Sequence, residues 1–359
     1  MTRRIRIAGG LLATLIAGAG ILFLCSALSA LAAPASPQAE AAKQQYEQGA
    51  TLYRQGDYEG ALLALKKAVE LEPRSAEAHY LLGMAYYNGR KQPKDAIEEI
   101  KKAIQINPRF GQAYYDLGLI YQAQDKPTDA EQALTRAVEL SPDEQSHLAL
   151  ARLHERNRNT SQAIRAYLAL LAIKPEQADA LYSLGYLYDG QKDSRRAREM
   201  LERLLKVVPT HSDGWYLLGR IAEKENRLKD AVTAYRQAIA AKPDLVDAHY
   251  NLGFLYRSMD RQDEAAKQFQ EVIRLKPEYA EAHMNLGGVY TGLNKLDEAE
   301  KEYEKALELK PKLAEAHYSL GVFYELHRKD AAKALAQYRR YLELGGKDER
   351  VERIVGKKK

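Results

Sequence analysis

The chain has 359 residues, a formal net charge of +5 and a single cysteine, and 29% of its residues are charged. Much of the basic excess lies at the two ends, in three arginines within the first six residues and in the lysines of residues 357–359, while lysine and glutamate are interleaved elsewhere. A nucleic-acid-binding stripe needs concentrated positive charge and a disulfide framework needs several cysteines, so neither class of protein is indicated.

The first 35 residues form an element of their own, which we interpret as a signal peptide or a membrane anchor. The arginines precede an uncharged stretch, residues 7–39, that is rich in leucine, isoleucine, alanine and glycine. Small residues around Ala32 and Ala35 fit the cleavage pattern of a secretory signal, yet the stretch could also stay in a bilayer as an anchor. Either interpretation predicts export of the rest of the chain, because positive charge before an apolar run keeps the N-terminus in the cytoplasm. The repeats would then be periplasmic, secreted, or anchored in the inner membrane, with membrane contact through this segment alone.

A short linker is expected at residues 36–41, and from Ala42 to Leu344 the sequence repeats itself. Eight prolines recur at steps of 35, 34, 33, 34, 34, 34 and 34 residues, beginning at Pro73 and ending at Pro311. A glycine column, with Ala151 substituting in the fourth unit, and an alanine column keep the same period. Such a period means that one supersecondary unit is copied many times. Each unit is too small to bury its own apolar face, so neighbouring units must stack into a solenoid.

Each unit contains two stretches with apolar residues spaced i, i+3, i+4, i+7, which predicts two amphipathic helices. Turn residues such as Gly56 and Asp57 separate the two stretches, and the recurrent proline ends the second helix because it cannot continue the hydrogen-bond ladder. Glycine and alanine at fixed positions let the paired helices approach closely. The sequence therefore predicts an all-α protein of nine helical hairpins.

Several segments resemble the tetratricopeptide repeat. They include "AEAHYSLGVFYEL" (Ala314–Leu326), "DAHYNLGFLY" (Asp247–Tyr256) and "DEAEKEYEKALELKP" (Asp297–Pro311). The resemblance covers nine units and implies a right-handed superhelix whose first helices line a concave groove for segments of partner proteins. Units two and nine depart from the pattern, because each carries one extra residue, which we place between the two helices.

A stripe of tyrosines is the main candidate for recognition. At three positions before the small residue stand Tyr46, Tyr80, Tyr115, Tyr182, Tyr216, Tyr250 and Tyr318. Beside them lie Asn251 and Asn285, and one position after the small residue lie Arg152, Arg220 and Phe254. At 100° per residue these side chains point away from the second helix, so we expect them to face the groove. The alternative is that the tyrosines pack on the neighbouring hairpin.

Two further columns have competing interpretations. Acids stand six positions before the glycine in the last five units: Asp179, Asp213, Asp247, Glu281 and Glu315. They could favour a basic partner, but a negative charge in the first helical turn also stabilises the helix itself. A histidine column suggests metal at first sight, yet successive hairpins are too far apart to share one ion. We therefore expect the histidines to be packing residues.

The sequence indicates no catalytic set, cofactor site or metal site. We read the chain as a non-enzymatic scaffold of the cell envelope that binds other proteins and not nucleic acid. A self-assembling, homo-oligomeric envelope protein is the alternative, and a non-catalytic subunit of a glycosyltransferase-type complex is a remote one. Residues 345–359 are expected to be a capping segment and a basic tail, with Val351, Ile354 and Val355 on one face of a short helix.

Overall fold

The structure, a computed structural model, describes residues 36–356, and all regular secondary structure within this range is helical. Nineteen α-helices and two short π-helical segments follow one another along the described residues. The helices are α1 (Pro37–Arg54), α2 (Tyr58–Leu71), α3 (Ala76–Ala85), η1 (Tyr86–Arg90), α4 (Pro93–Ile106), α5 (Gly111–Ala123), α6 (Pro127–Leu140), α7 (Glu144–Arg156), α8 (Thr160–Ile173), α9 (Ala178–Gly190), α10 (Ser194–Val207), α11 (Ser212–Lys224), α12 (Leu228–Ala241), α13 (Val246–Ser258), α14 (Gln262–Leu275), α15 (Ala280–Gly292), α16 (Leu296–Leu309), α17 (Ala314–Phe323), η2 (Tyr324–Arg328), α18 (Ala331–Glu343) and α19 (Glu349–Gly356).

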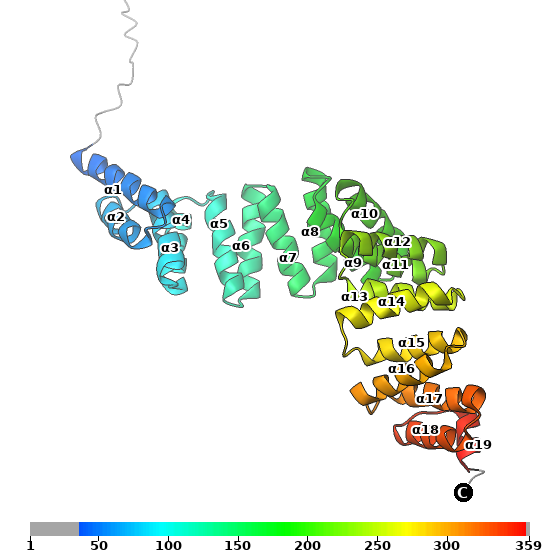
Figure 1. Cartoon of the computed structure of the whole chain (residues 1–359). Helices are drawn as coiled ribbons and strands as arrows, with labels where there is room; N and C mark the ends of the chain where they lie inside the picture. The colour runs from blue at the N-terminus through cyan, green and yellow to red at the C-terminus, as the bar shows by residue number, and fades with distance from the viewer. Residues whose placement is uncertain (1–35, 357–359) are drawn as a thin grey trace, which may run out of the picture.

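Consecutive helices pack in pairs from α1 with α2 to α17 with α18, which confirms the nine predicted hairpins. The pairs stack into a right-handed superhelical solenoid with its two ends far apart (Figure 1). The expected signal or anchor segment, residues 1–35, and the basic tail, residues 357–359, lie outside the described residues. No helix within residues 36–356 is long and apolar enough to cross a membrane.

The linker expected at residues 36–41 is wrong, because α1 already begins at Pro37. Proline is well tolerated at the first helical position, where its missing N–H would have had no partner. The Ser36 hydroxyl accepts a hydrogen bond from the backbone N–H of Ala39 at 3.1 Å and so caps the helix. Ser-Pro here starts a helix instead of ending one, and the first unit is longer than the sequence suggested.

The glycine column marks the closest approach of the two helices in a hairpin. A Cβ atom built on Gly118 would lie 2.6 Å from the Leu134 side chain. A Cβ atom on Gly219 would lie 2.7 Å from the ring of Tyr235. Real Cβ contacts are longer than this, so glycine is required for the observed helix separation.

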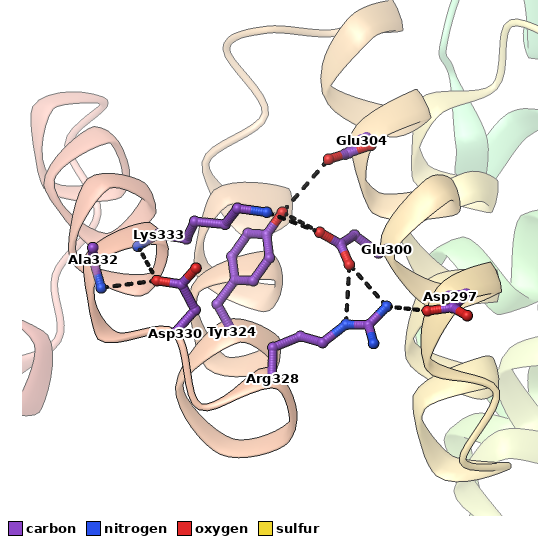
Figure 2. Close-up of polar contacts among 8 residues, drawn as sticks. All are labelled: Asp297, Glu300, Glu304, Tyr324, Arg328, Asp330, Ala332 and Lys333. Carbon is purple, nitrogen blue, oxygen red and sulfur yellow. Dashed lines mark hydrogen bonds and ion pairs between the residues drawn. The ribbon is translucent and has the colours of Figure 1, made fainter.

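The extra residues of units two and nine do not lie in the connecting turns, as we had placed them. They are absorbed into the π-helical segments η1 and η2 at the ends of α3 and α17. A π-turn accommodates one more residue inside a helix, so the apolar positions before and after it keep their register. Each π-turn ends in an arginine that contacts the second helix of the preceding unit. Arg90 pairs with Glu59 on α2 at 2.6 Å, and Arg328 pairs with Glu300 on α16 at 2.9 Å (Figure 2).

The histidines of this column are buried and form hydrogen bonds within the chain, which confirms their predicted packing role; they are His79, His147, His249, His283 and His317. In His283, Nδ1 lies 2.6 Å from the Glu302 carboxylate on the second helix of its own unit, and Nε2 lies 3.0 Å from the Pro277 carbonyl. Both partners are acceptors, so both ring nitrogens must carry protons in this arrangement. The indole N–H of Trp215 likewise donates to the Pro209 carbonyl at 2.8 Å.

Both ends of the array differ from its interior. Unit one has glutamines, Gln45 and Gln48, at the two positions where the other units carry a histidine, an aromatic residue or a leucine and then a leucine. At the other end α19 packs on the last hairpin as expected, with Val351 fully buried and Ile354 and Val355 partly buried. These are the polar and covered faces that a repeat array needs at its ends.

Candidate functional site

The first helices of the hairpins line the concave side of the array. First helices of neighbouring units, such as α5 with α7 and α9 with α11, contact each other directly. Second helices of neighbouring units do not pack on each other in this way, because the next first helix lies between them, as α9 does between α8 and α10. A row of helix pairs that is closer on one side must curve toward that side.

All seven tyrosines of the predicted stripe are half-buried, and several of them bridge neighbouring units. The Tyr80 hydroxyl donates to Asp116 at 2.7 Å, and the Tyr216 hydroxyl accepts from Asn251 at 3.2 Å. The Tyr250 ring stacks on Tyr279 with centroids 5.3 Å apart. The competing interpretation, that the tyrosines pack on the next hairpin, therefore describes much of their environment. They fix the spacing of the units and leave only part of each ring for a partner.

Burial also raises the pKa of several of these tyrosines. Loss of water contact raises the pKa of Tyr46, Tyr115, Tyr182 and Tyr250 above the ordinary phenol value. These four hydroxyl groups therefore stay neutral at physiological pH and can act as hydrogen-bond donors and acceptors.

Asn285 was predicted to face the groove, and the structure corrects this expectation. Its side chain is only 4% exposed. The amide donates to the Tyr250 hydroxyl at 3.0 Å and to the Glu281 carbonyl at 2.8 Å, and its oxygen accepts from Arg257 at 2.8 Å. Every hydrogen-bonding atom of the side chain is thus used within the array. Asn251 is half-buried and makes the equivalent bond to Tyr216.

An accessible row on the concave face stands one position after the small residue. It consists of Arg152 on α7, Tyr186 on α9, Arg220 on α11 and Phe254 on α13. Tyr186 is 55% exposed and Phe254 is 43% exposed. Cationic and aromatic side chains therefore alternate along four successive first helices, and we call these four residues the central row.

Tyr186 was missed at the sequence level, although it shares its column with the three other members of the central row. The signal was present, since the column could have been read in every unit and not only in the units that hold arginine or phenylalanine. Among the large hydrophobic residues that are exposed in residues 36–356, two are aromatic, and Tyr186 is the more exposed of them.

Charges surrounding the central row are partly paired. Arg152 forms an ion pair with Asp179 on the next first helix at 2.6 Å, with both side chains more than half exposed. Arg220 lies 4.0 Å from Asp189, whose carboxylate already binds Lys224 at 2.7 Å. An exposed pair such as Arg152 with Asp179 contributes little to stability and can exchange partners easily.

Within the acid column, Asp179 and Glu281 have cationic partners inside the array. Glu281 accepts from Lys310 at 2.7 Å, and this hydrogen bond lowers the pKa of the Glu281 carboxyl. Asp213, Asp247 and Glu315 are exposed in the first turns of their helices. The central row and these acids provide contact area and hydrogen bonds for binding. Within residues 36–356, no three histidine, cysteine, aspartate or glutamate side chains meet in a way that could hold a metal ion.

Comparisons with known families point to one repeat. A family model described as TPR repeat matches residues 49–89, 255–294 and 289–327. Two models described as Tetratricopeptide repeat match residues 148–194 and 186–246 in one case and residues 88–153 in the other. Together the three models cover most of the array.

Solved structures agree on the fold. The C-terminal part of a TPR repeat-containing protein from Cytophaga hutchinsonii is similar with a TM-score of 0.59 and 17% identity, over 67% of this chain and 99% of that one. The complex Naa15/Naa10 bound to HypK-THB is similar with a TM-score of 0.50 and 15% identity, over 86% and 64%. MamA is 29% identical over 48% of this chain and 94% of its own, with a TM-score of 0.44. No curated protein sequence matches the chain significantly.

Proposed function

This chain belongs to the tetratricopeptide repeat family, and we propose that it is a non-enzymatic scaffold that binds segments of other proteins along its concave face. Proteins with this repeat are generally scaffolds for other proteins. The observation that carries the proposal is the central row, in which two exposed rings alternate with two arginines on four neighbouring helices.

The composition of the central row suits recognition. Aromatic and arginine side chains contribute most of the binding energy in many protein interfaces. Rings such as Tyr186 and Phe254 offer rigid contact area, and Arg220 can form a pair with a carboxylate of the partner. The guanidinium of Arg257 lies over the Phe254 ring at 5.0 Å and holds that ring in place.

The length of the central row predicts the length of the bound segment. Packed helices lie about 10 Å apart, so four neighbouring first helices span about 30 Å along the groove. An extended chain covers about 3.3 Å per residue, and the row therefore matches an extended segment of about nine residues.

Site-specific photo-crosslinking tests this proposal. A photoreactive phenylalanine is placed at Tyr186 or Phe254 in the groove and, as a control, at the exposed Gln237 on the outer helix α12. We expect a defined partner to be captured in cells from both groove positions and not from the control. Capture of that partner only from Gln237 would place the binding surface on the outer side.

The scaffold is proposed to act outside the cytoplasm, in the cell envelope. The support is the arginine-led apolar segment of residues 1–35, which matches an export signal in length and in charge. Whether the segment is cleaved decides between a periplasmic or secreted protein and one anchored in the inner membrane.

Self-association is a second candidate function, and helix α8 favours it. Its solvent-facing positions hold Leu168, which is 43% exposed, together with the exposed Ala169 and Ala172. The same positions of the neighbouring helix α10 hold a glutamate, an arginine and a lysine. If two copies pack through α8, sedimentation equilibrium will show a dimer that Leu168→Glu dissociates, while Thr135→Glu at the same position of α6 has no effect.

A further inference from the structure

In most units, a tyrosine stands three positions after the small residue of the glycine column. It fills the space between its own helix and the second helix of the preceding unit. These tyrosines are Tyr86, Tyr121, Tyr188, Tyr256, Tyr290 and Tyr324. Tyr324 shows the arrangement fully (Figure 2): its hydroxyl donates to Glu300 on α16 at 2.9 Å and also points to Glu304 at 3.5 Å. The ammonium group of Lys333 lies over its ring at 4.8 Å. In this unit the ring, the cation and the hydroxyl acceptor together form one slot.

Two other units repeat the ring and its covering cation, with a different partner or none for the hydroxyl. The Tyr290 hydroxyl accepts a hydrogen bond from Gln270 on the preceding second helix at 2.8 Å, and Lys295 lies over its ring at 5.7 Å. The guanidinium of Arg261 stacks on Tyr256 at 4.4 Å. In both units, the cation that covers the ring stands four positions before the alanine that recurs in the second helix of every unit.

Unit six has the slot without its tyrosine. Ala222 stands in the tyrosine column, and a hollow of about 180 Å³ lies beside it, between α10, α11 and α12. Its lining includes Trp215, Leu218, Ile221 and Ala222. Trp215 does not replace the missing ring, because its indole N–H bonds to the Pro209 carbonyl, as the histidines of this column do in other units.

A cation and one hydroxyl acceptor of the slot have counterparts in unit six, whereas Arg198 holds the position that Glu300 has in front of Tyr324. Arg227 lines the hollow at the position that Arg261 holds in the next unit. Glu202 on α10 also lines it, at the position from which Glu304 contacts Tyr324. A cavity of about 150 Å³ with apolar walls accepts benzene, so the hollow has room for one aromatic ring.

We propose that this hollow is a binding slot for a tyrosine side chain of a partner protein. The ring would pack on Ala222 and Trp215 beneath the Arg227 guanidinium, and its hydroxyl would donate to Glu202. The slot opens between α10 and α12 and uses no residue of the central row. If no tyrosine binds in this slot, the proposed function of the concave face is therefore unaffected.

Trp215 is the only tryptophan of the chain and provides a built-in reporter. We would label the full-length protein with 5-fluorotryptophan, record its fluorine NMR spectrum and titrate it with p-cresol, which is the side chain of tyrosine. The expected result is a saturable shift of the Trp215 resonance with a dissociation constant in the millimolar range, as burial of a single ring implies. Toluene, which lacks the hydroxyl, should bind several-fold more weakly, and Glu202→Leu should remove that difference.

The decisive variant is Ala222→Tyr, which restores the tyrosine that the other units carry. It should abolish the response to p-cresol and leave the melting temperature unchanged or higher. Ala240→Tyr, on the exposed side of α12, is the matched control and should respond like the unaltered protein. If Ala222→Tyr does not fold, Ala222→Met fills the same space and carries the same expectation. Absence of a p-cresol shift, or a shift that persists in the filled variant, would overturn the proposal.

Discussion

Replacing Gly219 by alanine should destabilise the sixth hairpin although alanine is the better helix former. The added Cβ atom would lie 2.7 Å from two carbon atoms of the Tyr235 ring. That ring is fully buried, its hydroxyl donates to Glu223 at 2.7 Å, and Tyr216 lies against it at 5.8 Å between centroids. It can move aside only by giving up these contacts.

The expected size of the effect follows from two opposing terms. Overpacking a tight core typically costs about 1–3 kcal/mol, whereas alanine for glycine inside a helix gains about 1 kcal/mol. The difference is a net loss of about 0–2 kcal/mol for Gly219→Ala, with about 1 kcal/mol at the middle of that range, measured by urea denaturation followed by circular dichroism.

Two other glycines provide the comparison series. At Gly253 the nearest atoms belong to the Phe269 ring at 3.1 Å, so Gly253→Ala should be close to neutral. At Gly190 no atom that the structure describes beyond its immediate neighbours lies within 4 Å of the new Cβ, and Gly190→Ala should stabilise the protein. The reasoning would be refuted if Gly219→Ala were as stable as Gly190→Ala.

Three further predictions concern titration, the C-terminal cap and export. Burial alone would lower the pKa of His283, but the hydrogen bonds of the ring to Glu302 and to a backbone carbonyl raise that pKa above 6.5. The contribution of His283 to stability is therefore present below pH 6.5 and is lost as the pH rises through the raised pKa. Denaturation midpoints measured across that range should therefore fall, and Glu302→Gln should flatten the dependence. Truncation after Gly346 removes α19 with the fully buried Val351 and should cost about 2 kcal/mol of unfolding free energy or cause association; an unchanged melting curve and mass would show that the segment contributes nothing. Alkaline phosphatase fused after Lys359 should be active in a Gram-negative host, and activity of a cytoplasmic reporter alone at this site would contradict export.

The architecture could be predicted from sequence because two signals agree along the whole chain. The period of the prolines gives the unit, and the glycine column gives the contact between its two helices, as at Gly219 and Tyr235. The position of the histidines in the repeat was also sufficient to predict that they pack inside the array. These features depend on the unit and its immediate neighbours, which is why one unit's sequence suffices to predict them.

Local exceptions could not be predicted in the same way. An extra residue keeps the apolar register equally well as a longer turn or as a π-turn, so the sequence did not distinguish the two for η1 and η2. Pro37 is compatible with both a linker and the first residue of a helix, and the preceding Ser36 decides between them.

Accessibility on the concave face was the least predictable property. Asn251 and Asn285 share one column, yet only Asn285 has an arginine, Arg257, from its neighbour that completes its burial. The tyrosines of the stripe face both the groove and the next hairpin, so helical periodicity gives their direction but not how much of each ring is free. Tyr186 lay in the right column and was missed because the column was read in only some of the units.

The central claim is that partner proteins bind to the concave face through the central row. Its most direct test is the affinity of the purified crosslinking partner, measured by isothermal titration calorimetry, for the unaltered chain and for the double variant Tyr186→Ala, Phe254→Ala. Both rings are exposed, so the variant should keep its helicity and its melting temperature. We expect the affinity to fall by about tenfold or more, which corresponds to about 1.4 kcal/mol and is typical of aromatic anchors. Full affinity in a folded double variant would show that the central row is not the binding surface.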